Sequence, residues 1–129
     1  MKHLKRIFES NEDDKKYIEE CFLDISENPN FEVDDLITLT EVNLRSRKVY
    51  LKLHIELGKN LKKPVPVGSN LYTGMYNVDL EFLRNKSKVM SELFDDIEVA
   101  IERIKDRFQN AEIKIESNRR EEINILVSI

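Results

Sequence analysis

The stretch Val49-Tyr50-Leu51-Lys52-Leu53-His54-Ile55-Glu56-Leu57 alternates apolar and polar side chains without a break. Successive side chains of a β-strand point to opposite faces, so this pattern predicts a strand with one buried face and one wet face. Residues 31–42 are rich in Leu, Ile, Thr and Val and predict a strand before it, joined through a polar turn at 43–47. Residues 76–82 alternate again and predict a third strand.

Two helical stripes flank these three strands. The first has apolar residues at helical spacing from Tyr17 to Ile25, and we expect it to begin in the polar segment that starts at Ser10. Asn28-Pro29-Asn30 is expected to end it. The second helix is expected to follow a cap at Asn85 or Ser87. Its apolar stripe recurs every three or four residues and comprises Met90, Phe94, Ile97, Ile101, Ile104 and Phe108.

Two short strands complete the chain, at 113–115 and 123–129, with a turn at 117–120. The predicted fold is therefore a single α+β domain in the order α-β-β-β-α-β-β. We expect a mostly antiparallel five-stranded sheet with both helices packed on one face. Residues 10–129 form this domain, and residues 1–9 are an N-terminal peptide. An apolar terminal strand must be paired or covered, and as an unpaired edge it offers an interface. Its apolar residues are Ile123, Ile125, Val127 and Ile129.

Composition limits the classes of protein. The 129 residues are 40% hydrophobic, which is enough for one core, and the net charge is −4. No apolar run approaches the ~18 residues of a membrane helix, so we expect no membrane association. The single cysteine excludes an internal disulfide framework and favours a reducing, intracellular location. Residues 17–44 contain eight acids and no Lys or Arg, whereas residues 45–63 contain seven Lys or Arg and one acid. This polarity either steers a partner or reflects two solvated faces of opposite sign.

The sequence offers little chemistry. Cys21 lies on the apolar stripe of the first helix, which predicts a buried structural thiol. His54 lies on the wet face of its strand between Lys52 and Glu56, which predicts an ordinary surface histidine. With His3 in the N-terminal peptide, these residues predict no metal site, no cofactor and no catalytic group. Enzymatic activity would require a pocket that gathers His54 with acids from elsewhere in the fold.

The basic segment is a candidate binding surface for an anion or a partner. Its residues are Arg45, Arg47, Lys52, Lys59, Lys62 and Lys63. Tyr50 and Tyr72 are available for stacking on bases, as nucleic-acid binding requires. The pI of about 5.3 is low for a domain that binds nucleic acid tightly.

The opening MKHLKRIFES resembles the N-terminal peptide on internal head proteins of T-even-like tailed phages. Those peptides begin Met-Lys and end in an aliphatic residue, any residue and Glu, where a maturation protease cuts. The resemblance covers ten of 129 residues and implies cleavage between Glu9 and Ser10, after Ile7-Phe8-Glu9. Phe8 is bulkier than the usual middle residue, and Ser10 replaces the usual Ala or Gly. The alternative is a short amphipathic helix that docks on the domain.

The order of elements, together with the acidic pI, is similar to that of tail-terminator and neck proteins of tailed phages, a likeness of topology alone. These observations predict a non-enzymatic protein-binding module, with a virion or assembly component of a tailed phage as the specific version. Its partners would be further copies of the chain or other virion proteins, and it would be found in the cytoplasm or in the virion. The alternative prediction is a nucleic-acid-binding regulatory protein that uses residues 45–63.

Overall fold

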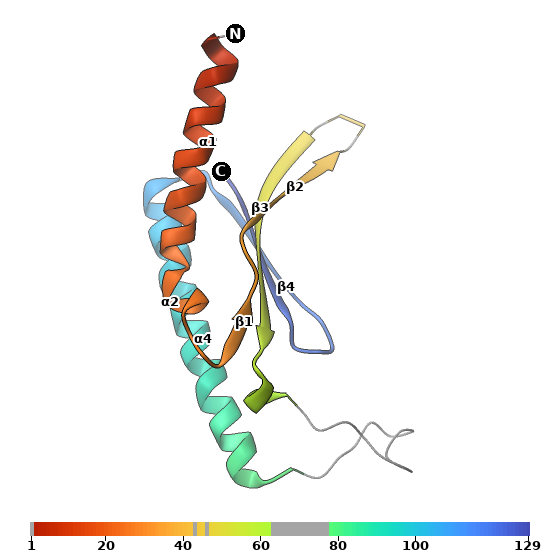
Figure 1. Cartoon of the computed structure of the whole chain (residues 1–129). Coiled ribbons are helices and arrows are strands. Elements are labelled where there is room, and N and C mark those ends of the chain that lie inside the picture. The colour runs from red at the N-terminus through yellow and green to blue at the C-terminus, as the bar shows by residue number, and fades with distance from the viewer. Residues whose placement is uncertain (1, 43, 46, 63–77) are drawn as a thin grey trace.

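A five-stranded antiparallel sheet is built around the alternating stretch (Figure 1). The computed structural model describes residues 2–42, 44–45, 47–62 and 78–129, and for residues 2–11 the backbone alone. The strands are β1 (Phe31–Val33), β2 (Ile37–Val42), β3 (Arg47–Leu57), β4 (Glu112–Ser117) and β5 (Ile123–Ser128). β3 pairs with β1 and β2 along one edge and with β5 along the other, and β4 pairs with β5. The predicted α+β class and the five-stranded antiparallel sheet are confirmed.

The helices cover one face of this sheet (Figure 1). They are α1 (Lys2–Cys21), α2 (Leu23–Ser26) and α4 (Leu80–Arg107), and a single 3₁₀ turn, η1 (Lys59–Leu61), follows β3. The core lies between α1, α2, α4 and the sheet. Its largest fully buried side chains are Ile18, Phe22, Ile25, Ile55, Leu61, Leu93, Ile104, Ile125 and Val127. No helix among the described residues is long and apolar enough to cross a bilayer.

The start of the first helix differs from the prediction. α1 begins at Lys2 and passes through the polar segment at Ser10 without a break, so those residues do not cap a helix. Its last turns carry part of the predicted buried stripe, including Ile18 and Cys21. Helical structure ends at Ser26 in α2, just before Asn28-Pro29-Asn30, as expected.

The single strand predicted over residues 31–42 is two strands. Val33 of β1 lies opposite Ile55, and Ile37 of β2 lies opposite Lys52. Residues 34–36, which connect β1 to β2, therefore face only residues 53–54 of β3, three residues against two. This one-residue insertion is a bulge, and Leu36 within it is buried in the core. An odd insertion exchanges the two faces of the strand. Consequently β2 directs Ile37 and Leu39 to the helix-free face.

The third predicted strand, over residues 76–82, is wrong where the chain is described. Asp79 is extended at the N-cap position and α4 begins at Leu80, so Phe82 is helical. Tyr76 lies outside the described residues. Asn85 and Ser87 fall inside α4 and do not cap it. The predicted order of elements still agrees, because the first predicted strand supplies two strands.

The buried stripe of α4 is rotated relative to the predicted one. Its buried residues are Lys86, Val89, Leu93, Ile97, Ala100 and Ile104. Phe94 is instead 53% exposed. The helix is therefore turned so that part of the expected apolar stripe reaches the edge of the sheet.

β5 is an interior strand, which corrects the predicted terminal edge. It pairs with β3 on one side and β4 on the other, so its backbone has no free edge. Ile123, Ile125 and Val127 are buried against the helices. Ile129 lies beyond β5 and is 48% exposed. On this side of the sheet the free edge belongs to β4.

Candidate functional site

The basic residues predicted to form one binding surface lie far apart. Arg45 and Arg47 are at the β2–β3 turn, whereas Lys59 and Lys62 follow the other end of β3. At about 3.3 Å per residue, the eleven residues of β3 separate these groups by roughly 33 Å. Lys52 lies between them on the helix-free face, and Lys63 lies outside the described residues. These positions do not form a single continuous basic surface.

Tyr50 is unavailable for stacking on a base. It is only 3% exposed. The ammonium groups of Lys48 and Lys114 lie 5.5 Å and 5.2 Å from its ring centroid. Lys48 also forms an ion pair with Glu112. Tyr72, the other aromatic residue considered for stacking, lies outside the described residues.

Two further sequence-based predictions concern α1. The backbone is helical through Ile7, Glu9 and Ser10, the residues of the predicted processing site, and their side chains lie outside the described part of the chain. Cys21 is buried as predicted. Burial raises the pKa of its thiol, and this effect outweighs the opposing influence of Arg103.

An apolar groove lies where α4 meets the free edge of the sheet. It has a volume of about 430 Å³, and its walls include Phe94, Ile97 and Ile101 from α4 and Ile115 from β4. Phe94 and Ile115 are 53% and 54% exposed. Because large apolar side chains gain by leaving water, this groove is a candidate docking surface.

Beside this groove, one edge of β4 pairs with no other strand among the described residues. The Asn118 N–H donates to the Glu122 carbonyl, which places Asn118 opposite Glu122 as a hydrogen-bonded position. Hydrogen-bonded and non-hydrogen-bonded positions alternate along an antiparallel pair. Ile113 and Ile115 therefore direct their N–H and C=O groups away from β5, towards the free edge.

A second groove, of about 580 Å³, lies between α1 and the first half of β3. Val49, Leu51 and Val127 form its apolar floor, with Ile129 at one end. Glu12 and Lys15 of α1, together with Arg47 and Lys48 of β3, make its rim charged. Charged residues line both grooves, since Glu98, Glu102 and Lys105 of α4 also line the groove beside β4.

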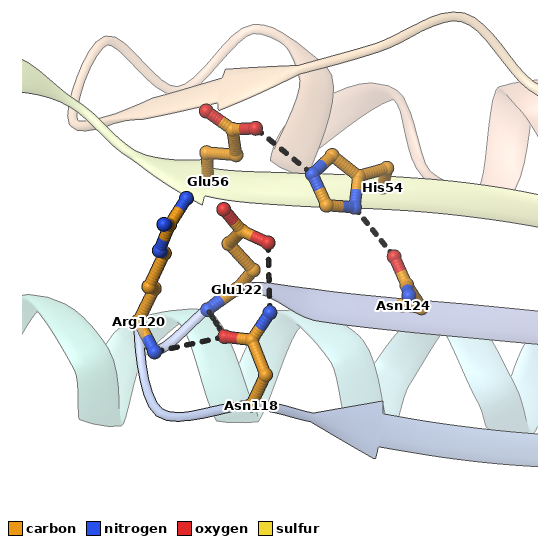
Figure 2. Close-up of polar contacts among 6 residues, drawn as sticks. All are labelled: His54, Glu56, Asn118, Arg120, Glu122 and Asn124. Atoms are coloured by element: carbon orange, nitrogen blue, oxygen red, sulfur yellow. Dashed lines mark hydrogen bonds and ion pairs between the residues drawn. The ribbon is translucent and has the colours of Figure 1, made fainter.

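A polar cluster occupies the helix-free face of the sheet (Figure 2). His54 of β3 lies opposite Asn124 of β5, and its Nδ1 is 2.5 Å from Asn124 Oδ1. His54 Nε2 is 3.0 Å from Glu56 Oε1. Glu122, immediately before β5, brings its carboxylate to the same place: ligand atoms of His54, Glu56 and Glu122 all lie within 4.8 Å of one another.

The two hydrogen bonds of His54 favour its charged form. Asn124 Oδ1 and the Glu56 carboxylate are both acceptors, so both ring nitrogens donate when the ring is protonated. The bond to Asn124, and then the bond to Glu56, raise the pKa of His54. The negative charges of Glu56 and Asp34 act in the same direction, and partial burial opposes them.

The β4–β5 turn holds Glu122 in position. Asn118 Nδ2 donates to Glu122 Oε2 at 2.8 Å, and Asn118 Oδ1 accepts the N–H groups of Arg120 and Glu122 at 2.9 and 3.1 Å. Glu121 has a φ of 61°, in the left-handed region that costs a residue with a Cβ roughly 1–2 kcal/mol. Its carboxylate forms an ion pair with the buried Lys86 of α4. The turn is thereby attached to the helix, while Glu122 is directed to the opposite face.

The sequence predicts His54 as an ordinary surface histidine and assigns no site role to Glu56, Glu122, Asn118 or Asn124. The cluster depends on the pairing of β3 with β5, which joins residues about 70 positions apart. The spacing of residues within either strand does not predict such a pairing. The one available signal was that polar Asn124 interrupts an apolar strand on its outward face.

Searches against protein-family models, curated proteins and solved structures found no match to this chain.

Proposed function

We propose that the protein is a non-enzymatic binding module that associates through the free edge of β4, and that a second copy of the chain occupies this edge. One observation carries the proposal. Phe94 and Ile115 remain half-exposed in an apolar groove, directly beside a strand edge that pairs with no other strand in the part of the chain that the structure describes. Strand addition satisfies such an edge, and alternate side chains then enter the neighbouring groove.

The charges of β4 favour a second copy as the occupant. Antiparallel pairing of β4 with itself about Ile115 places Lys114 opposite Glu116 of the other copy, twice. Opposite charges in such cross-strand positions stabilise the pair, whereas like charges destabilise it. Glu112 is already paired with Lys48 in its own chain, and Glu116 forms no ion pair among the described residues. The symmetric register therefore uses the acid of β4 that forms no ion pair within the described part of its own chain.

The same symmetry closes the groove. A two-fold axis through paired edge strands is perpendicular to the sheet, so the helices of both copies lie on one face. The two α4 helices are then neighbours across the seam, and Phe94 and Ile115 of each copy meet apolar surface of the other. The contact is isologous, as in most dimers.

The test compares lysine substitutions of equally exposed residues on α4. Phe94→Lys places a charge in the groove and is expected to abolish association. Val99→Lys is the matched control, because Val99 is 54% exposed, as Phe94 is 53% exposed, yet it lies outside the groove. Molar mass is measured by light scattering across a concentration series for both variants, and Ile115→Lys is included as a second groove variant.

The proposal predicts a concentration-dependent dimer for the unaltered chain and for Val99→Lys, and a monomer for the two groove variants. An unaltered chain that stays monomeric at all concentrations would contradict the proposal. Equal dimerisation of all four proteins would also contradict it, because the interface would then lie elsewhere.

The more specific proposal is that this module is a virion or assembly component of a tailed phage. It rests on the likeness of MKHLKRIFES to phage processing peptides and on the topological likeness to tail-terminator and neck proteins. N-terminal sequencing of the protein isolated from its natural source tests it. A chain that begins at Ser10 and co-purifies with capsid or tail proteins is expected, and an intact Met1 together with unrelated partners would refute it.

A further inference from the structure

We infer that His54, Glu56 and Glu122 form a binding site for a divalent transition-metal ion, with Zn²⁺ as the best match. The three residues offer one imidazole nitrogen and two carboxylates, from β3 and from the start of β5. Imidazole ligation suits Zn²⁺, whereas Mg²⁺ and Ca²⁺ prefer sites made of oxygen alone. The inference is independent of the proposed dimer, since the cluster lies on the helix-free face and away from the groove.

The orientation of the imidazole supports metal binding. A metal-binding histidine commonly donates its second ring N–H to an oxygen acceptor, which fixes the tautomer and the plane of the ring. Asn124 Oδ1 accepts from Nδ1 of His54 at 2.5 Å, so Nε2 is the nitrogen that remains for a metal. Nε2 already faces the Glu56 carboxylate at 3.0 Å, so one metal ion could bind both groups.

The second carboxylate is also held in place by a neighbour. Asn118 donates to Oε2 of Glu122 at 2.8 Å, and this leaves the other oxygen available. Among the residues that the structure describes, no basic side chain forms an ion pair with Glu122. Arg120 extends from the same turn in Figure 2, but it forms no ion pair in the described part of the chain.

The local charge favours a cation. Glu32 of β1 lies directly opposite Glu56, and Asp34 contributes a further negative charge close to His54. One imidazole ring is therefore surrounded by several carboxylates, and like charges in neighbouring strands repel one another. A divalent cation relieves this repulsion more completely than the proton on His54 does.

The spacing requires a small adjustment. The three ligand atoms lie within 4.8 Å of one another. With bonds of ~2.1 Å, tetrahedral Zn²⁺ places its ligands about 3.4 Å apart. The Glu56 side chain is 35% exposed, so rotation about its side-chain bonds can widen its 3.0 Å separation from Nε2 of His54 and bring it closer to Glu122 without moving the sheet. Three protein ligands leave the fourth position for water.

Isothermal titration of the full chain with ZnCl₂ tests the site, in protein that carries no histidine tag. We expect one Zn²⁺ per chain, and at least ~10-fold weaker binding for Glu56→Gln and Glu122→Gln. Glutamine at position 122 retains an acceptor for Asn118. Asn124→Ala removes only the orienting acceptor and is expected to weaken binding by about 10–100-fold. Glu41→Gln is the control, because Glu41 shares this face but lies opposite Lys48 near the far end of β3.

Co²⁺ provides a readout that needs no variant. Its paramagnetism is expected to shift or broaden the amide signals of His54, Glu56 and Glu122 first in the unaltered chain. Absence of Zn²⁺ binding at millimolar concentration would overturn the inference. Unchanged affinity in folded Glu122→Gln, or paramagnetic effects centred on another part of the chain, would overturn it as well.

Discussion

The ion pair between Lys86 and Glu121 gives a sharp prediction about stability. Lys86 is 7% exposed on the inner face of α4, and Glu121 lies in the turn that positions Glu122. Glu121→Ala leaves the ammonium group of Lys86 buried without its counter-charge. Breaking a buried pair in this way costs about 3–5 kcal/mol. The Glu121 side chain is 38% exposed and the lysine stem can reach towards water, so we expect about 2 kcal/mol.

The expected loss for Glu121→Ala contains no change in backbone strain, because alanine also carries a Cβ and has the same left-handed penalty at φ 61° as glutamate. Glu121→Gly removes that penalty, and its loss is expected to be about 1 kcal/mol smaller than that of Glu121→Ala. Lys86→Met removes the buried charge and keeps an apolar side chain of similar length. It is expected to change stability by less than ~1 kcal/mol, because replacing a buried ion by an apolar group is often neutral.

Urea unfolding of the single variants and of Lys86→Met with Glu121→Ala measures the coupling free energy. The second substitution should add almost nothing once Lys86 is absent, so we expect a coupling of about 2 kcal/mol. Glu92→Ala, which removes an exposed carboxylate of α4 outside the groove, serves as the control. If Glu121→Ala were no more destabilising than Glu92→Ala, the argument from burial would be refuted.

Three further predictions concern the core and the titrating groups. Ile125→Ala, at a fully buried position of the interior strand β5, should reduce the free energy of unfolding by about 2–5 kcal/mol in urea titrations. Cys21 should react much more slowly with a thiol reagent at pH 8 in the folded chain than in denaturant; equal rates would contradict its burial and its raised pKa. NMR titration in EDTA should give His54 a pKa above the ordinary ~6.5, and Asn124→Ala should lower it. The folded chain binds this proton more tightly than the unfolded chain, so the stabilisation by protonated His54 is complete below pH ~6.5 and is lost as pH rises through the folded pKa. Urea unfolding at pH 5 should therefore show a lower free energy of unfolding for His54→Gln than for the unaltered chain. Equal values would contradict this prediction.

The sequence predicted those parts of the fold that depend on local periodicity. The alternation from Leu51 to Leu57 identified β3, because a strand between helices and solvent needs one apolar and one polar face. Residues 112–117 and 123–128 were found for the same reason. The helical stripe of α1 was also recognised, although its polar first half concealed that the helix begins at Lys2.

The errors occurred where pairing between distant segments decides the structure. The bulge at Leu36 depends on the register of β1 and β2 against β3, and nothing in residues 31–42 alone reveals it. The alternation over residues 76–82 is also compatible with a helix start, and α4 begins within it at Leu80. The prediction of an edge at residues 123–129 is wrong because the position of a strand at the end of the chain says nothing about its place in the sheet.

The candidate sites could be predicted only in part for the same reason. His54 and Glu56 share one face of a single strand, so their proximity follows from local geometry. Glu122 reaches them only through the pairing of β5 with β3. The groove beside β4 likewise depends on the rotation of α4 that leaves Phe94 at the sheet edge.

Hydrogen exchange at the free edge of β4 tests the central claim most directly. The amides of Ile113 and Ile115 point away from β5, so in an isolated chain they are unprotected, whereas in the symmetric dimer they donate to the second copy. We predict that both amides become protected as protein concentration rises, and that Phe94→Lys abolishes this protection while Val99→Lys retains it. Rapid exchange of both amides at every concentration would contradict the account.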